Sequence, residues 1–187
     1  MAGAIGNRVR YDDAMANADQ RRVLGGVAAA VIGTATAFAL GYAFLGTLHP
    51  ANDDVASRLA FALRWDVFPT FMLLVGIGRV GNARFKSSEA ITGATPEEGP
   101  LAIDKRYLQN TLEQLTLFVI AHLAFATLAP ADKLHLLPVA AMWFVIARIA
   151  FLVGYHKAPT ARAFGFGSTF YPTVAFLIYD AIAVVRG

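Results

Sequence analysis

The sequence predicts an all-α integral membrane protein built as a bundle of five transmembrane helices. Of the 187 residues, 57% are hydrophobic, and the apolar residues are gathered into long blocks separated by short charged stretches. A helix needs about 20 mostly apolar residues to span a bilayer. Five blocks reach that length, at residues 23–47, 57–79, 111–129, 134–155 and 164–185.

The N-terminal region divides into two parts. Residues 1–20 are polar and are interpreted as a cytoplasmic tail, either flexible or forming a short surface helix. Residues 21–48 are predicted to form the first span, because their apolar run is longer than the apolar core of about 7–15 residues of a cleavable signal peptide. Small residues allow close packing of membrane helices, so Gly33 and Gly41 are interpreted as marking a packing face.

The second block is followed by a long polar stretch, about 80–105. This stretch contains Gly93, Pro96, Gly99 and Pro100, and it is the only internal segment long enough to fold over the mouth of a site. The last four blocks, within residues 57–187, are then joined by one long and two short loops. Short connections favour an antiparallel bundle of neighbouring helices.

The basic residues predict the orientation. Arginine and lysine are abundant in the N-terminal tail, in the stretch 80–105 and near 156–162, whereas the alternate loops are acidic or nearly neutral. Cytoplasmic loops carry an excess of lysine and arginine. The N-terminus is therefore expected in the cytoplasm and the C-terminus outside.

Several ionisable side chains fall within the apolar blocks, where each costs about 2.5–3.5 kcal/mol on insertion scales. For Asp66, His122 and Asp180 we favour interhelical ion pairs over contact with a ligand. Arg64 and Asp66 project about 200° apart on a helix and so need separate partners. Pairing of Asp66 with Arg148, or with Arg64 of a neighbouring subunit, would indicate a structural role.

A polar stripe begins the third block. Arg106, Asn110 and Glu113 are spaced by four and three residues, so their guanidinium, amide and carboxylate share one helical face. Opposite charges and an amide in one place predict a site for a zwitterionic ligand.

A second stripe runs down the fourth block to the same end of the bundle. Arg148, Phe151 and Tyr155 share a face, and Arg162 follows in the next turn. Because the two blocks are antiparallel neighbours, the stripes are expected to meet at the cytoplasmic surface. The alternative is that Arg106 and Arg162 merely contact lipid headgroups.

Other kinds of site are disfavoured. The chain has no cysteine, and its four histidines are scattered without metal-ligand spacing, so no metal site is predicted. No basic patch interleaved with exposed aromatic residues suggests a nucleic-acid partner, and no serine nucleophile motif is present.

Together, the motifs Arg106-x-x-x-Asn110-x-x-Glu113 and Arg148-x-x-Phe151-x-x-Gly154-Tyr155 followed by Arg162 resemble the membrane-associated proteins in eicosanoid and glutathione metabolism, the MAPEG superfamily. The resemblance covers about residues 57–187 and is strongest to its mattrin-like branch, because of the extra first span and the segment 163–172.

The resemblance implies a homotrimer of four-helix protomers with glutathione bound between subunits near the cytoplasmic face. Arg162 matches the arginine that activates the thiol. The positions that match the family's glutathione site are Arg106, Asn110, Glu113, Arg148, Phe151 and Tyr155, with either Arg79 or Arg84. Leu108, Gln114 and Phe151 stand where leukotriene-synthase-like members have glutamine, tyrosine and tyrosine.

Three functions are therefore carried forward. The first is a glutathione-dependent transferase or peroxidase acting on a lipophilic electrophile or lipid hydroperoxide. The second is a non-catalytic lipid-binding or scaffold protein with the same fold. The third, a channel or transporter, is ranked last, because the proline residues alone are weak signs of discontinuous helices.

Overall fold

The computed structural model describes residues 2–93 and 98–186, and for residues 2–14 and Glu89 it describes the backbone alone. All secondary-structure elements of the described residues are helices. Five segments are long and apolar enough to cross a membrane, as predicted. The elements are α1 (Ala2–Phe44), α2 (Val55–Phe85), α3 (Ser88–Ile91), α4 (Pro100–Leu128), η1 (Ala131–Lys133), α5 (Leu136–Lys157), η2 (Pro159–Arg162) and α6 (Ala163–Arg186).

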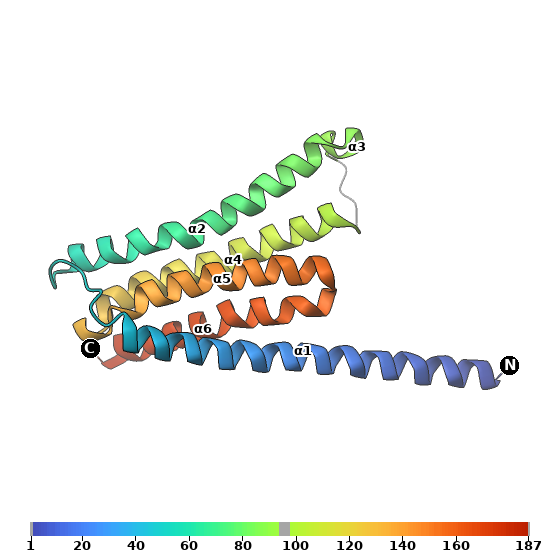
Figure 1. Ribbon diagram of the computed structural model, residues 1–187, viewed down its shortest axis with the longest axis horizontal. Helices are drawn as coiled ribbons and strands as arrows, with labels where there is room; N and C mark the ends of the chain where they lie inside the picture. Colours follow the sequence, from blue (N-terminus) through green and yellow to red (C-terminus); the bar gives the residue numbers. More distant parts are fainter. Residues whose placement is uncertain (1, 94–97, 187) are drawn as a thin grey trace.

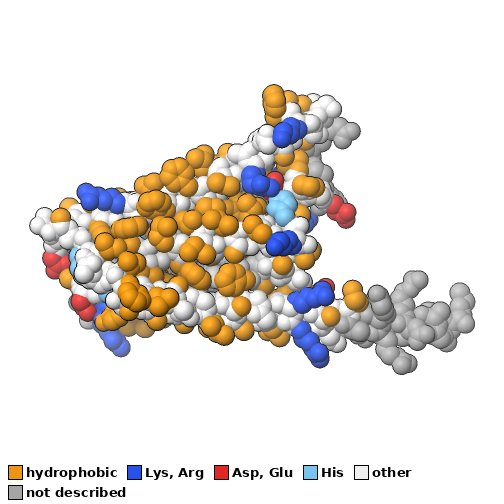
Figure 2. Space-filling view, viewed as in Figure 1, with side chains coloured by type: hydrophobic (Ala, Val, Ile, Leu, Met, Phe, Trp, Pro, Cys, Tyr) orange, Lys and Arg blue, Asp and Glu red, His pale blue; other side chains and the backbone are white. Residues whose placement is uncertain are grey.

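The five long helices run roughly along one direction (Figure 1). In that view α2 and α1 lie at opposite edges, with α4, α5 and α6 between them, and α1 extends beyond the bundle at the N-terminal end. α2 packs mainly on α4, and α1 packs on α6 and α5. Charged side chains gather toward the two ends of the face in Figure 2, and hydrophobic side chains cover its middle. This is the distribution expected of a bundle that spans a bilayer.

The N-terminal tail and the first span form one helix. α1 begins at Ala2 and continues without a break to Phe44, so the backbone of residues 2–20 is helical. The two glycines predicted to mark a packing face do so. A Cβ added at Gly41 would lie 2.3 Å from Val139, and one at Gly33 would lie 3.3 Å from the ring of Trp143.

The non-helical part of the stretch 80–105 is shorter than the sequence suggested. α2 continues to Phe85, and α4 begins at Pro100, eleven residues before the apolar block. Proline is favoured in the first turn of a helix, where its missing N–H has no partner to lose, and Gly99 takes a positive φ of 86° just before it. Residues 94–97, including Pro96, lie outside the described residues.

The start of α2 is fixed by a local cap. The backbone N–H and the hydroxyl of Ser57 both donate to the carboxylate of Asp54, at 2.9 and 2.7 Å. These two contacts, the hydroxyl first, hold the pKa of the Asp54 carboxyl below its usual value. The cap fixes the point at which the chain enters the second span.

Asp66 on α2 is buried and faces His122 on α4. The Asp66 Oδ1 and His122 Nδ1 atoms are 2.6 Å apart, and the other ring nitrogen of His122 lies 2.9 Å from the carbonyl oxygen of Leu137. The two atoms are in ion-pair contact, although the angles of this contact are not those of a hydrogen bond. Asp66 thus has an interhelical partner within its own protomer, and that partner is His122 and not Arg148, one of the two partners that the sequence suggested as signs of a structural role.

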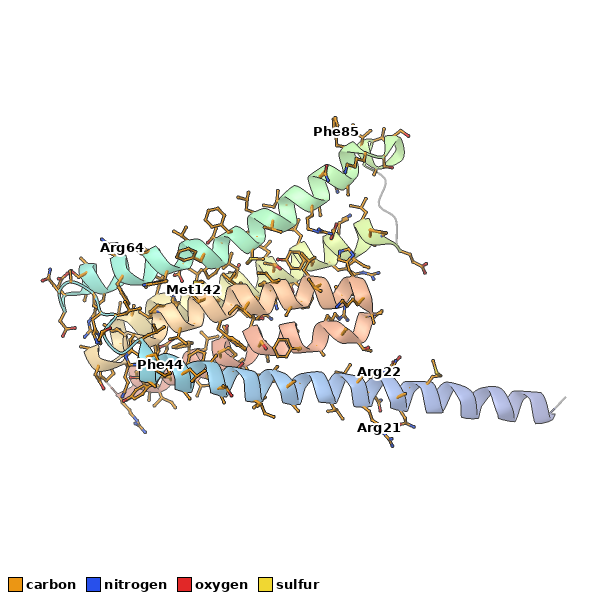
Figure 3. All side chains as sticks on the ribbon, viewed as in Figure 1. Arg21, Arg22, Phe44, Arg64, Phe85 and Met142 are labelled. Carbon is orange, nitrogen blue, oxygen red and sulfur yellow. The ribbon has the colours of Figure 1, made fainter. Side chains whose placement is uncertain are left out.

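The other two charged residues of these spans have different surroundings. Arg64 projects from the outer side of α2 (Figure 3) and makes no hydrogen bond or ion pair with any described residue. Asp180 on α6 is only 5% exposed, and its carboxylate oxygens have no hydrogen-bond partner within the described chain. The predicted interhelical ion pair is present between Asp66 and His122, whereas Asp180 forms none with any residue that the structure describes.

Replacing His122 by alanine is expected to destabilise the bundle by about 3–5 kcal/mol, because the buried Asp66 carboxylate loses its partner. Replacing Asp66 and His122 together by leucine should restore most of that loss, since apolar residues then fill the site. Thermal unfolding in detergent measures both effects. His49→Ala, in an exposed loop, is the matched control, and an equal loss in the single and double variants would contradict the pairing.

Candidate functional site

Predicted site residues from three elements meet at one cavity. Its volume is about 560 Å³, within the range of about 300–1,000 Å³ common for small-molecule sites. We call it the cleft. It is lined by Val23 and Val27 of α1, Arg106 and Asn110 of α4, Phe151 and Tyr155 of α5, Pro159, Thr160 and Arg162 of η2, and Ala163, Phe166 and Tyr171 of α6.

Arg148 lies behind the cleft and positions its wall. Its side chain is completely buried, and one terminal nitrogen donates to Asn110 Oδ1 at 2.8 Å. The other terminal nitrogen donates to the Gly165 carbonyl at 3.0 Å and to Thr169 Oγ1 at 2.6 Å. One guanidinium therefore ties α4, α5 and α6 together. It orients the Asn110 amide, whose nitrogen is left as a donor for the cleft.

Phe151 supports the same guanidinium from α5. The carbon at the centre of the Arg148 guanidinium lies 4.7 Å from the centroid of the Phe151 ring, within reach of a cation–π interaction. Phe151 is only 2% exposed. Its ring therefore contributes apolar surface to the cleft lining and a cation–π contact to Arg148 behind the lining. Phenylalanine has no side-chain hydrogen-bonding group.

Two glycines bring η2 and α6 close to α5. A Cβ at Gly165 would lie 2.4 Å from the backbone nitrogen of Phe151, and one at Gly154 would lie 2.5 Å from the carbonyl oxygen of Ala161. Both contacts are with backbone, which cannot rotate away. These positions therefore require glycine, and the close approach places Arg162 beside Tyr155.

Arg162 lies over the ring of Tyr155. The centre of its guanidinium is 4.5 Å from the ring centroid. Such a cation–π contact holds the long side chain in place while leaving its N–H groups available to a ligand. With Arg106 across the cleft, the lining contains two arginines and, among the residues that the structure describes, no carboxylate. The electrostatics favour an anionic ligand.

Besides Arg148, three predicted residues do not line the cleft in the described chain. Glu113 is exposed and accepts a hydrogen bond from Gln109 Nε2 at 2.9 Å. Arg79 is paired with Asp104 at 2.8 Å, and His156 approaches the same carboxylate oxygen at 2.8 Å. Arg84 is exposed near the end of α2. Helical periodicity placed Glu113 on the correct face, but not within the depth of this cavity.

Sequence reasoning did not single out the apolar side of the cleft. Val23 and Val27 come from α1, and Phe166 and Tyr171 from α6. The four-residue spacing of Val23 and Val27 indicated one helical face, but nothing in the sequence showed which helix that face would meet. The contact of α1 with η2 and α6 was needed to find them.

The cleft can hold an anion and present a nucleophile to an apolar group. Arg106, Arg162 and the Asn110 amide can bind carboxylates, and the Tyr155 hydroxyl can donate one further hydrogen bond. A guanidinium beside a thiol stabilises the thiolate form, which is the reactive nucleophile. The protein has no cysteine, so such a thiol would have to belong to the ligand.

Comparison with known proteins agrees with the two motifs. The model of the MAPEG family matches residues 59–182. The mouse and bovine proteins called Transmembrane protein 79 are 29% and 28% identical to the chain, each over 139 residues. Both alignments cover 74% of this chain and 35% of the relative, so the chain spans about a third of the length of the curated relatives it matches. No solved structure matches the chain.

Replacement of Arg148 by glutamine is expected to lower the free energy of unfolding by about 3 kcal/mol, because hydrogen bonds from a charged donor on α5 to α4 and α6 are lost. For a chain of this size the unfolding midpoint should fall by roughly 6–12 °C. Thermal unfolding in detergent measures the shift. Arg84→Gln, at an exposed arginine, is the control, and equal midpoints for the two variants would show that Arg148 does not hold the helices together.

Proposed function

As a member of the MAPEG family, this chain is an integral, multi-pass membrane protein, and we propose that it binds glutathione in the cleft as the co-substrate of a transferase or peroxidase. The acceptor would be a lipophilic electrophile or a lipid hydroperoxide that enters from the bilayer. The observation that carries this proposal is the convergence of Arg106, Asn110, Tyr155 and Arg162 on one cavity.

Glutathione fits the chemistry of the lining. It has two carboxylates, one ammonium and one thiol, so its net negative charge at neutral pH is complementary to the cationic cleft. In the proposed mode Arg106 and the Asn110 amide bind its carboxylate end, and Tyr155 donates a hydrogen bond to it. Arg162 stabilises the thiolate. The carboxylate that pairs with the ammonium would be Glu113, which is exposed on the protomer.

The conjugation step needs no protein nucleophile. With the thiol proton released to water, the thiolate sulfur forms a bond to an electrophilic carbon. The bond from that carbon to its leaving group breaks, and the leaving group departs with the electron pair. The role of Arg162 is to lower the energy of the sulfur anion before attack.

A homotrimer would complete the site. Glu113 is exposed on the outside of the protomer, and Arg79 and Arg84 reach the surface at the same end of α2. In a trimer such residues can face a ligand held by the adjacent subunit. This arrangement would account for predicted ligand contacts that the protomer alone does not bring together.

The second candidate is a lipid-binding or scaffold protein with the same fold. It is favoured by two replaced positions, because Gln114 and Phe151 are both buried and offer no polar group to the lining. Each lost hydrogen bond to a charged ligand group would remove about 1.5–3 kcal/mol of binding. In this case Arg106 and Arg162 would contact anionic headgroups.

Isothermal calorimetry on the detergent-solubilised protein separates these candidates. Glutathione is expected to bind with micromolar to low-millimolar affinity, and Arg106→Ala should weaken binding by roughly 10- to 100-fold, the equivalent of one charged hydrogen bond. Arg186→Ala, at an exposed arginine in the last turn of α6, should leave the affinity unchanged. The absence of binding by folded protein at millimolar glutathione would sink the glutathione proposal and favour the lipid-binding function.

Arg162→Ala is expected to leave glutathione bound but with its thiol protonated at neutral pH, because the stabilising guanidinium is gone. The ultraviolet absorbance of the thiolate, titrated against pH, measures this directly. The titration curve should move to higher pH by one unit or more in the variant, which corresponds to at least about 1.4 kcal/mol. An unchanged curve would remove Arg162 from the role of activator.

The proposed orientation places the N-terminus and the cleft on the cytoplasmic side and the C-terminus outside. Because the chain has no cysteine, single cysteines report topology without a background. We expect a membrane-impermeant maleimide to label Asn52→Cys in intact cells and Ser88→Cys only after permeabilisation. The reverse pattern would invert the orientation.

A further inference from the structure

The extra helix α1 forms part of the cleft. Val23 and Val27 line it together with Arg106 and Arg162. The family match begins only at residue 59, so α1 lies outside the matched region. A helix that merely anchored the chain would not need to contribute side chains to a cavity built by α4, α5, η2 and α6.

α1 is held firmly where it meets the cleft. A Cβ at Gly26 would lie 2.9 Å from the Cβ of Ala163 and 3.2 Å from the backbone nitrogen of Phe164. This contact is immediately next to Arg162. Gly26 therefore lets α1 press against the first residues of α6, and it brings the valines on either side, Val23 and Val27, to the cleft.

Contacts deeper in the membrane fix the rotation of α1. Ala30 is fully buried, and a Cβ at Gly167 would lie 2.9 Å from its Cβ. One turn further on, Trp143 Nε1 donates to Thr34 Oγ1 at 3.0 Å. Because both contacts lie on the same face of α1 as Gly26, the helix cannot turn its valines away without losing them.

The cleft is polar at one end and apolar along its depth. Its basic groups come from η2 and from the cytoplasmic part of α4, whereas Phe166 and Tyr171 follow along α6. The nine residues from Ala163 to Tyr171 cover about 12 Å of helix, directed into the membrane span. Val27 lies one turn deeper than Val23 and so faces this apolar part.

From this arrangement we propose that α1 is the element that selects the apolar part of the ligand. Val23 and Val27, together with Phe166 and Tyr171, form an apolar wall that accommodates a substituent attached to an anionic head bound by Arg106 and Arg162. The inference rests on the proposed function for one point, that the head is glutathione. The ligand class is then a glutathione whose sulfur carries, or is about to form a bond to, a compact apolar group.

The wall also limits the size of that group. Val27 is half-buried within the cleft lining, and a larger side chain there would occupy the space of the substituent. Val31, one turn further along α1 and 50% exposed, lies outside the lining. The same substitution at Val27 and Val31 therefore compares a change inside the cleft with one outside it on the same helix.

Calorimetry with glutathione and S-hexylglutathione tests the wall. The wild-type protein should prefer S-hexylglutathione by roughly tenfold or more, because part of the hexyl chain is removed from water. Val27→Phe should abolish that preference while changing glutathione affinity by less than about threefold. Val31→Phe should behave as wild type. Glutathione binding with a preference unchanged in Val27→Phe would overturn the role of α1 and leave the proposed function intact.

If neither compound binds, the proposed function fails and a second measurement decides the role of α1. In the cysteine-free chain, Val23→Cys should be labelled by a water-soluble maleimide and protected by octanoate but not by acetate. Leu24→Cys, adjacent but 66% exposed and outside the lining, should be labelled equally with either anion. Protection of Val23→Cys by octanoate alone would support an apolar wall for an amphipathic anion, and equal labelling would overturn it.

Discussion

The buried guanidinium of Arg148 is the constraint on which the candidate site depends. A charge in the centre of a membrane bundle is costly and needs partners. The two terminal nitrogens of Arg148 donate to Asn110 on α4 and to Gly165 and Thr169 on α6, and the guanidinium lies over the ring of Phe151, whereas its Nε has no hydrogen-bond partner among the described residues. Three of the helices that line the cleft, α4, α5 and α6, are therefore held together by one side chain that is not part of the lining.

A buried ion pair also holds helices together farther from the cleft. Asp66 and His122 join α2 to α4, and the Leu137 carbonyl extends the contact to α5. The two polar clusters thus connect different helix pairs. In a membrane, where lipid is as apolar as the core, such polar contacts and close van der Waals packing distinguish the correct arrangement of helices from others.

The cleft arises where the close packing ends. Glycines at 154 and 165 draw η2 and α6 against α5, and Gly26 draws α1 against the same turn. Beyond these contacts the helices separate enough to leave a cavity with arginines at one end and aromatic and valine side chains along its depth. One geometric feature therefore produces both the anion-binding end and the apolar wall.

The sequence by itself determined the five spans, the packing role of Gly33 and Gly41, and four polar residues of the site, because apolar block length and helical periodicity are local properties of a chain. It did not determine the partner of Asp66, the separation of Arg79 and Glu113 from the cavity, or the participation of α1. Each of these depends on which helix faces which and at what depth. Only tertiary packing decides that, since periodicity gives the direction of a side chain from its own helix axis and carries no information about the neighbour it meets.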